Sequence, residues 1–151
     1  MKVFRLHMGL TWRQPNTWRL LDVREDTTCQ QLHEAIQLLF GWEDKHPWAL
    51  GIEEESVGTG RFDKFQPEAT IGELLRKQRF DACYQYDLPD YWEAWVQIQQ
   101  ITLIKDAPLF KLIDGAGNKP GEMENGTFWP KPYEAKAIKQ QLADKFGKPN
   151  T

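Results

Sequence analysis

The feature that most constrains this chain is one amphipathic helix, predicted between residues 27 and 42 and marked by its own start and stop signals. Thr27 stands three residues before Gln30, the spacing of a capping box, in which each side chain bonds the backbone N–H of the other residue. Gly41 follows where a helix end favours a left-handed residue. Apolar residues at helical spacing define one face between these signals: Cys29, Leu32, Ile36, Leu39 and Phe40. We expect the remaining elements to cover this face.

Alternation of apolar and polar residues predicts five or six strands around this helix. The first and second strands, and the fourth and fifth, are separated by short segments rich in turn-forming residues, which is typical of antiparallel hairpins. The sixth follows Pro108 and is expected at an edge of the sheet. In chain order, the predicted strands cover residues 3–10, 17–23, 48–52, 82–86, 92–98 and 109–113.

Two more helices are predicted in the second half of the chain. Thr70 and Glu73 repeat the capping-box spacing and open a short helix, which Gly72 weakens by about 1 kcal/mol relative to alanine. Pro132 and Gly147 supply the start and stop signals of a C-terminal helix. The inward-facing residues of this last helix recur at four-residue spacing: Ile138, Leu142 and Phe146.

The resulting order, β-β-α-β-α-β-β-(β)-α, indicates an α+β domain with a mainly antiparallel sheet of five or six strands and helices covering one face. Residues 53–69, with three consecutive glutamates, and residues 114–130, with four glycines and two prolines, are expected to form loops. No internal repeat or linker divides the chain, so residues 1–151 are predicted to form a single domain.

Composition and charge narrow the classes of function. The formal net charge of −3 lacks the basic excess of a nucleic-acid-binding surface, so a nucleic-acid partner is not expected. Cys29 and Cys83, the two cysteines, fall on apolar or strand-like positions, which is typical of free thiols in a reduced cytosolic protein. The N-terminus begins a strand rather than a signal peptide, and no apolar run approaches the roughly 20 residues that cross a bilayer. We therefore expect a cytoplasmic protein without a membrane partner.

Three segments resemble, in order and spacing, the plasmid pRiA4b ORF-three-like family. They are Thr17-Trp18-Arg19, the helix segment 27–42 with His46 just beyond it, and Y-Q-Y-D-L-P-D-Y-W-E at 84–93. The similarity extends over about residues 3–137. The family occurs on plasmids, insertion elements and bacterial chromosomes and is uncharacterised biochemically. The resemblance therefore implies a family and no defined reaction.

The chain departs from the family pattern at two places. Ala94 stands where the family has a histidine after W-E, and the segment 114–126, often cysteine-bearing in relatives, contains no cysteine here. Both departures weaken any metal site that would depend on those ligands. The resolvase label of some members is not carried over, because the chain has a single serine, Ser56, and no basic arm.

An acidic turn is the first candidate site. Asp87, Asp90 and Glu93 lie at three-residue steps through a tight turn, and hard cations such as Mg²⁺, Mn²⁺ or Ca²⁺ take carboxylate oxygens as ligands. His33 and His46 bracket the end of the main helix and would complete a mixed site. The alternative, which is the commoner arrangement, is that the aspartates bond the backbone of the turn and that Glu93 faces solvent.

His33 is the second candidate, on the shoulder of the apolar helix face and one turn before Gln37, so the imidazole and the amide lie side by side. A structural histidine, bonded to backbone or to an acidic partner, is a commoner outcome than a metal ligand or a catalytic base.

The tryptophans are the third candidate. Trp92 is predicted in the core and Trp95 on the opposite face of its strand, where an exposed indole either marks a binding surface or covers an open sheet face.

Two functions follow from these candidates. The favoured one is a non-catalytic binding or interaction module for an unknown protein or small molecule, with a groove between the end of the main helix and the acidic turn. The alternative is a metal-dependent, hydrolytic enzyme with Asp87, Asp90 and Glu93 as candidate ligands. No cofactor is predicted beyond this divalent metal. The candidate binding residues are His33, Gln37, Trp42, His46, Tyr86, Asp87, Asp90, Trp92 and Glu93.

Overall fold

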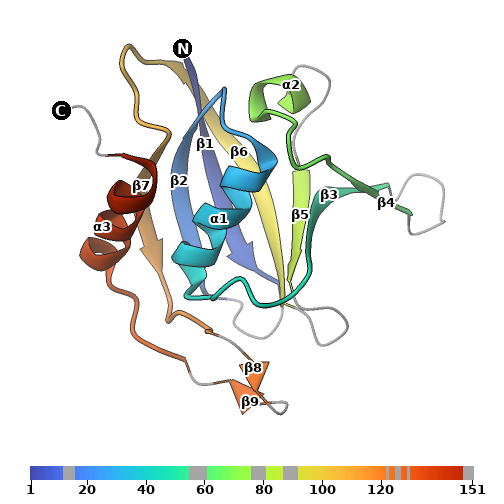
Figure 1. The fold of residues 1–151 in the computed structure, drawn as a ribbon, viewed down its shortest axis with the longest axis vertical. Helices are drawn as coiled ribbons and strands as arrows, with labels where there is room; N and C mark the ends of the chain where they lie inside the picture. Colours follow the sequence, from blue (N-terminus) through green and yellow to red (C-terminus); the bar gives the residue numbers. More distant parts are fainter. Residues whose placement is uncertain are drawn as a thin grey trace.

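A seven-stranded, wholly antiparallel sheet forms the body of the protein, in the strand order β4-β3-β5-β6-β1-β2-β7. Figure 1 shows helices α1 and α3 against one face of this sheet and α2 at one end of it. The predicted α+β class is therefore confirmed. The computed structural model describes residues 1–11, 16–54, 61–75, 81–86, 92–121, 123–124, 127–128 and 130–147.

The elements follow the chain in an order close to the predicted one. They are β1 (Lys2–Leu10), β2 (Trp18–Arg24), α1 (Cys29–Phe40), β3 (Trp48–Glu54), β4 (Arg61–Lys64), α2 (Ile71–Leu75), β5 (Asp81–Tyr86), β6 (Trp92–Leu103), β7 (Phe110–Ala116), β8 (Met123–Glu124), β9 (Thr127–Phe128) and α3 (Ala135–Phe146). None of the helices in the described parts of the chain has the length and apolar content needed to span a bilayer.

The sheet buries alternate residues on its helix-covered face, as the period of a half-buried strand requires. Along β1 these are Phe4, Leu6, Met8 and Leu10, and along β6 they begin with Trp92, Ala94 and Val96. The predicted hairpins are confirmed, because β1 pairs with β2 and β5 with β6, each antiparallel. β7 pairs only with β2 among the described strands, so the sixth predicted strand lies at an edge as expected.

The main helix begins one residue later than predicted. Thr28, in extended conformation, is the N-cap: its hydroxyl accepts from the Gln31 backbone N–H at 3.1 Å, and Gln31 Oε1 accepts from the Thr28 N–H at 3.0 Å. The sequence T-T-C-Q-Q allows the capping-box spacing twice, and Thr27 is instead buried, with its carbonyl accepting from Ile71 N–H. At the other end Gly41 has φ +73°, the left-handed conformation that glycine adopts without strain.

Two predicted loops contain strands. Residues 53–69 include β4, which pairs antiparallel with β3, and residues 114–130 include the end of β7 and the small β8–β9 hairpin. β4 reads R-F-D-K, so it lacks the repeated apolar positions by which a strand is recognised in a sequence. Backbone hydrogen bonds to β3 hold it as an edge strand, and such bonds leave no side-chain pattern.

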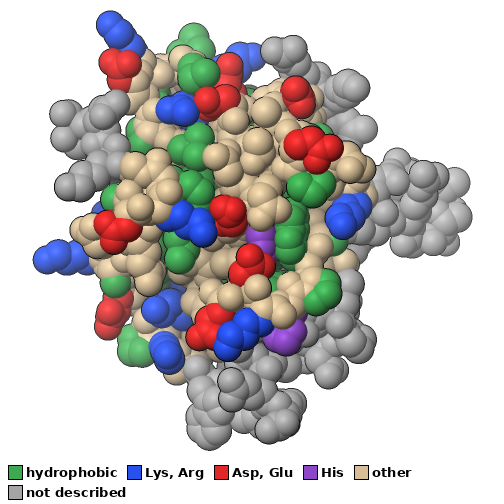
Figure 2. Space-filling model, viewed as in Figure 1, with side chains coloured by type: hydrophobic (Ala, Val, Ile, Leu, Met, Phe, Trp, Pro, Cys, Tyr) green, Lys and Arg blue, Asp and Glu red, His purple; other side chains and the backbone are tan. Residues whose placement is uncertain are grey.

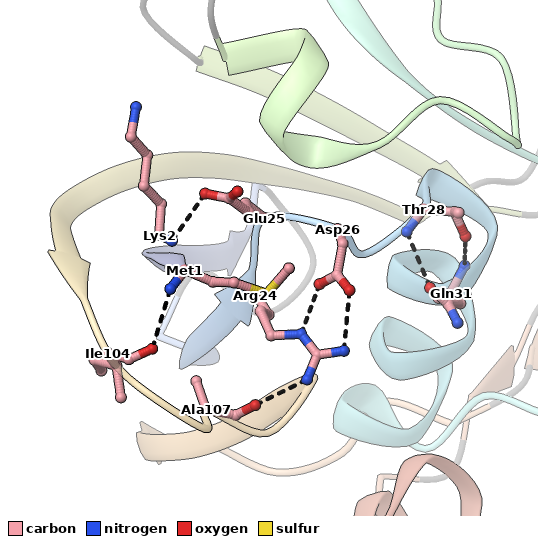
Figure 3. A network of polar contacts seen from close by, with 9 residues as sticks. All are labelled: Met1, Lys2, Arg24, Glu25, Asp26, Thr28, Gln31, Ile104 and Ala107. Carbon is pink, nitrogen blue, oxygen red and sulfur yellow. Dashed lines mark hydrogen bonds and ion pairs between the residues drawn. The ribbon is translucent and has the colours of Figure 1, made fainter.

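A polar network fastens the N-terminus beside the start of α1 (Figure 3). Arg24 donates from Nε and Nη2 to the two carboxylate oxygens of Asp26 at 2.6 and 3.0 Å, and from Nη1 to the Ala107 carbonyl at 2.9 Å. The Lys2 backbone N–H donates to Glu25 at 2.8 Å. The turn between β2 and α1 is thus tied to β1 and to the chain before β7.

The two threonines at the helix start provide a matched test of the cap. Thr28→Ala removes the acceptor for a helix N–H and should lower the free energy of unfolding by about 1 kcal/mol. Thr27→Val should leave it unchanged or raise it slightly, because the Thr27 hydroxyl is buried without a hydrogen-bond partner among the described residues. Urea unfolding of both variants measures the difference, and the opposite order would place the cap at Thr27.

Candidate functional site

Four residues, two from α1, one from β5 and one from the loop after the helix, form a closed ring of hydrogen bonds. Gln37 Nε2 donates to the Tyr84 hydroxyl at 2.7 Å, and His33 Nδ1 lies 2.7 Å from the same hydroxyl. His33 Nε2 lies 2.8 Å from Asp44 Oδ1, and the Asp44 backbone N–H donates to Gln37 Oε1 at 2.7 Å. The ring of His33, Gln37, Asp44 and Tyr84, here called the polar ring, joins helix, sheet and loop.

The bonding pattern assigns the protons of the ring. The Asp44 carboxylate only accepts, so the imidazole hydrogen lies on His33 Nε2; in the neutral imidazole Nδ1 then accepts from the Tyr84 hydroxyl, which itself accepts from Gln37. Burial lowers the pKa of His33, and the hydrogen bond and charge of Asp44 act in the opposite direction without reversing it. The imidazole is therefore neutral near pH 7.

Local sequence explains how the ring is built. His33 and Gln37 are one helical turn apart and point from the same side of α1. Gly41 and Asp44 both have positive φ, +73° and +54°, so the chain reverses after the helix and returns to the imidazole. Trp48, at the start of β3, stacks on His33 with ring centroids 4.1 Å apart and an interplanar angle of 6°.

A second group of residues, here called the buried aromatic cluster, lies beside the polar ring, under the end of α1. The Trp42 ring contacts Tyr86 and Trp92, with centroid distances of 5.1 and 6.1 Å. Tyr86 accepts from the Lys45 backbone N–H at 3.0 Å, and His46 meets the Tyr86 ring edge-on at 5.7 Å. These rings fill the core between helix and sheet rather than line an open groove.

The structure brings together most of the predicted site residues that it describes. His33, Gln37, Trp42, Tyr86 and Trp92 converge under the end of α1 and are all buried, with His46, half-buried, at the margin.

The acidic residues of the predicted site lie elsewhere or outside the described chain. Glu93 does not join the cluster, because it lies between Trp92 and Ala94, which face the helices, and so points to the opposite face of the sheet. Asp87 and Asp90 lie outside the described residues. Within the described part of the chain, no three His, Cys, Asp or Glu side chains are grouped as metal ligands.

Arg19 is a buried residue that the sequence analysis did not single out as a site. Its guanidinium has no exposed surface and donates to four backbone carbonyls, those of Trp18, Leu39, Ala116 and Gly117, at 2.7 to 3.2 Å. No described carboxylate forms an ion pair with it. The sequence did indicate that Arg19 is buried, because Arg19 alternates with the buried Leu21 and Val23 along β2.

Burial lowers the pKa of Arg19 to about 10, so the side chain stays charged at neutral pH. Its guanidinium lies over the Tyr133 ring at 4.2 Å and near the Phe40 ring at 5.2 Å. The carbonyls it binds come from β2, the end of α1 and the end of β7. Arg19 therefore holds these three elements together inside the fold.

The other face of the sheet carries no described helix and presents a second aromatic group. His7 lies between Trp18 and Trp95, meeting both edge-on, with centroid distances of 5.4 and 4.7 Å. A Cβ on Gly9 would lie 2.3 Å from Trp95 Cζ2, so the indole rests directly on the glycine. We call His7, Trp18 and Trp95 the outer aromatic cluster. All three side chains are partly exposed.

A family model describes most of the chain. The model of the Plasmid pRiA4b ORF-3-like protein family matches residues 2–134. The chain belongs to this family. No curated relative matches it.

A crystal structure of a protein of unknown function from Methanosarcina mazei Go1 has a similar fold, with a TM-score of 0.65. The alignment covers 95% of this chain and 82% of the other, at 22% sequence identity. At that identity the likeness concerns the fold alone. Among the residues of the segments that carry the family resemblance, His33, Gln37 and Tyr84 belong to the polar ring, and Trp42, Tyr86 and Trp92 to the buried aromatic cluster.

The two buried tyrosines of β5 allow a matched test of the polar ring. Tyr84→Phe leaves His33 Nδ1 and the Gln37 amide without their partner, and should lower the free energy of unfolding by about 2–3 kcal/mol. Tyr86→Phe removes a hydroxyl that accepts from the Lys45 backbone N–H and should cost about 1 kcal/mol. Denaturant unfolding of both variants checks this order. Equal losses would show that the ring adds nothing beyond one ordinary hydrogen bond.

The lowered pKa of His33 predicts a pH dependence of stability. Below the unfolded value of 6.5 the unfolded chain binds a proton that the folded chain does not, so the free energy of unfolding falls as pH is lowered. The slope from this residue is at most about 1.4 kcal/mol per pH unit. The free energy of unfolding, measured from pH 8 to 5, should therefore fall less steeply in His33→Gln than in wild type. Parallel curves would contradict the neutral, buried imidazole.

Proposed function

We propose that this protein is a non-catalytic binding domain whose contact surface is the outer aromatic cluster. The observation that carries the proposal is the position of Trp18, His7 and Trp95 on the face of the sheet that no described helix covers. Partly exposed indoles combine a large apolar surface with a polar N–H, and such residues are enriched in binding surfaces.

The polar ring supports a structural rather than a catalytic role for its histidine. His33 and Tyr84 have no exposed surface, and both nitrogens of the imidazole are engaged inside the ring. A substrate would have to break the ring and displace Trp48 to reach the imidazole. Burial also raises the pKa of Cys29 to about 12, so this thiol is not ionised at neutral pH and is a poor nucleophile.

The surroundings of the cluster indicate the kind of ligand. Gln99 Nε2 lies 3.3 Å from His7 Nδ1, and the exposed Gln97 is next to it in the β1–β6 register, so amides border the rings. The nearby Arg5 is paired with Asp22 through two hydrogen bonds of 2.8 and 3.1 Å. The surface therefore suits an uncharged ligand with an apolar ring or side-chain face and hydrogen-bonding groups around it, from a protein or a small molecule.

Neither the net charge nor the helix-covered face, which lies opposite the outer aromatic cluster, indicates a nucleic-acid partner. Figure 2 shows Lys and Arg side chains interspersed with Asp and Glu over the helix-covered face, without a continuous basic surface. With the net charge of −3, this agrees with a partner other than nucleic acid. Both cysteines are buried thiols outside any disulfide, and we place this binding in the reducing cytoplasm.

The alternative function, a metal-dependent hydrolase, rests on Asp87 and Asp90, which lie outside the described residues. Titration calorimetry with Mn²⁺, Mg²⁺ and Zn²⁺ tests it directly. Metal-dependent hydrolysis of a phosphoester that is lost in Asp90→Ala would overturn the non-catalytic proposal.

A screen of ring-containing fragments by ¹H–¹⁵N NMR tests the binding surface. We expect hits to shift the indole N–H signals of Trp18 and Trp95, and to weaken at least tenfold in Trp95→Ala. Gly9→Ala should have a similar effect with little loss of stability, because the three atoms nearest to the new Cβ all belong to the Trp95 indole.

Phe146→Ala is the matched control, since it truncates a partly buried aromatic side chain on the helix-covered side. It should leave fragment binding unchanged. Hits that persist in both Gly9→Ala and Trp95→Ala would place the binding surface elsewhere.

A further inference from the structure

β6 is longer than the strand beside it. It pairs with β1 from Ala94 to Leu103, but with β5 only from Trp92 to Gln97. From Ile98 to Leu103, therefore, no described strand pairs with the side of β6 that faces away from β1. Within the described residues, this half of β6, six residues long, is therefore an unpaired edge inside the sheet.

The hydrogen-bond pattern shows which backbone groups point to that edge. Ile104 N–H donates to the Met1 carbonyl at 3.0 Å, and the Met1 amino group donates to the Ile104 carbonyl at 3.4 Å (Figure 3). In an antiparallel pair such doubly bonded positions alternate with positions whose N–H and C=O point away from the partner strand. Ile101 and Leu103 are therefore in register to offer their backbone N–H and C=O to another strand.

The side chains at this edge lack the usual protection. Ile101 is 55% exposed and Leu103 is 80% exposed, the highest value among the large apolar side chains of the described residues. The sequence I-Q-Q-I-T-L from 98 to 103 contains no charge and no proline, two of the features by which natural edge strands discourage pairing. Its one irregularity is a β-bulge at Gln99, between the residues that pair with Leu6 and Arg5, so the regular edge runs from Gln100 to Leu103.

A cavity of about 350 Å³ adjoins the edge, between β6, the start of β1 and α2. Phe4 and Ile101 supply its apolar wall, and the remaining lining residues are Lys2, Glu25, Asp26, Thr70, Gly72 and Glu73. Asp26 is neutralised by Arg24, but no ion pair among the described residues links Glu25 or Glu73 to a cation. Lys2 offsets one of these two glutamates, so the cavity combines an apolar wall with a single excess negative charge.

We propose that the Ile98–Leu103 edge of β6 binds an extended peptide segment of a partner protein, which places a Lys or Arg side chain in the adjoining cavity. Strand addition satisfies the backbone groups of Ile101 and Leu103 and covers their side chains. The apolar wall suits the methylene stem of a long basic side chain, and Glu25 and Glu73 attract its charge. Ile101 and Leu103, which carry this surface, lie beyond Gln99, the residue that borders the outer aromatic cluster.

Three labelled hexapeptides test the proposal by fluorescence anisotropy: alternating Val-Lys, alternating Val-Glu, and a Pro-Lys peptide that cannot add as a strand. We expect the Val-Lys peptide to bind at least tenfold more tightly than the other two. Leu103→Pro should weaken it at least tenfold, because it removes an edge N–H while the hydrogen bonds of β6 to β1 remain. The double variant Glu25→Gln, Glu73→Gln should remove the preference for lysine over glutamate.

Amide hydrogen exchange of the wild-type protein gives a second measurement that does not depend on a variant. The N–H groups of Ile101 and Leu103 should become protected when the Val-Lys peptide is added. Trp95→Ala should bind this peptide as wild type does, which separates the failure of this proposal from that of the binding function above. Equal binding of the three peptides, unchanged exchange, or a dimer that is lost in Leu103→Pro would each overturn the proposal.

Discussion

The C-terminal end of α1 is tied to the sheet from two sides by buried hydrogen bonds. Arg19 reaches from β2 to the Leu39 carbonyl, while His33 and Gln37 meet the Tyr84 hydroxyl on β5. An unpaired polar group in this interior would cost free energy, so each tie depends on all of its partners being in place. These bonds therefore fix the position of α1 on the sheet, and with it the start of the loop from Gly41 to Trp48.

The segments that carry the family resemblance supply residues both to the framework and to the surface. They contain His33, Gln37 and Tyr84 of the polar ring and Trp42, Tyr86 and Trp92 of the buried aromatic cluster, but also Trp18 of the outer aromatic cluster. Trp18 and Arg19 illustrate the division, because they are adjacent in β2 and point to opposite faces. Arg19 joins the framework, and Trp18 joins the outer aromatic cluster. The two proposed binding surfaces lie away from the framework, where a partner can bind without opening the core.

The differences between the predicted and observed site have specific causes. The capping box was predicted one residue early, because T-T-C-Q-Q satisfies the spacing twice and only the hydrogen bond from Ile71 to Thr27 decides between the two registers. Glu93 was grouped with the acidic turn by its spacing in sequence, whereas the alternation of β6 turns it to the opposite face. β4 was assigned to a loop, because an edge strand held by backbone bonds needs no apolar pattern.

The sequence by itself determined the amphipathic helix, the two hairpins, the α+β class and the family, since each is written in patterns of neighbouring residues. It also placed His33 beside Gln37, one turn apart on α1. Only the tertiary structure decided that Tyr84, 51 residues from His33, closes their ring, and that four carbonyls surround Arg19. The physical reason is that such partners depend on strand order and register, which are set by the packing of the whole chain and leave no local pattern.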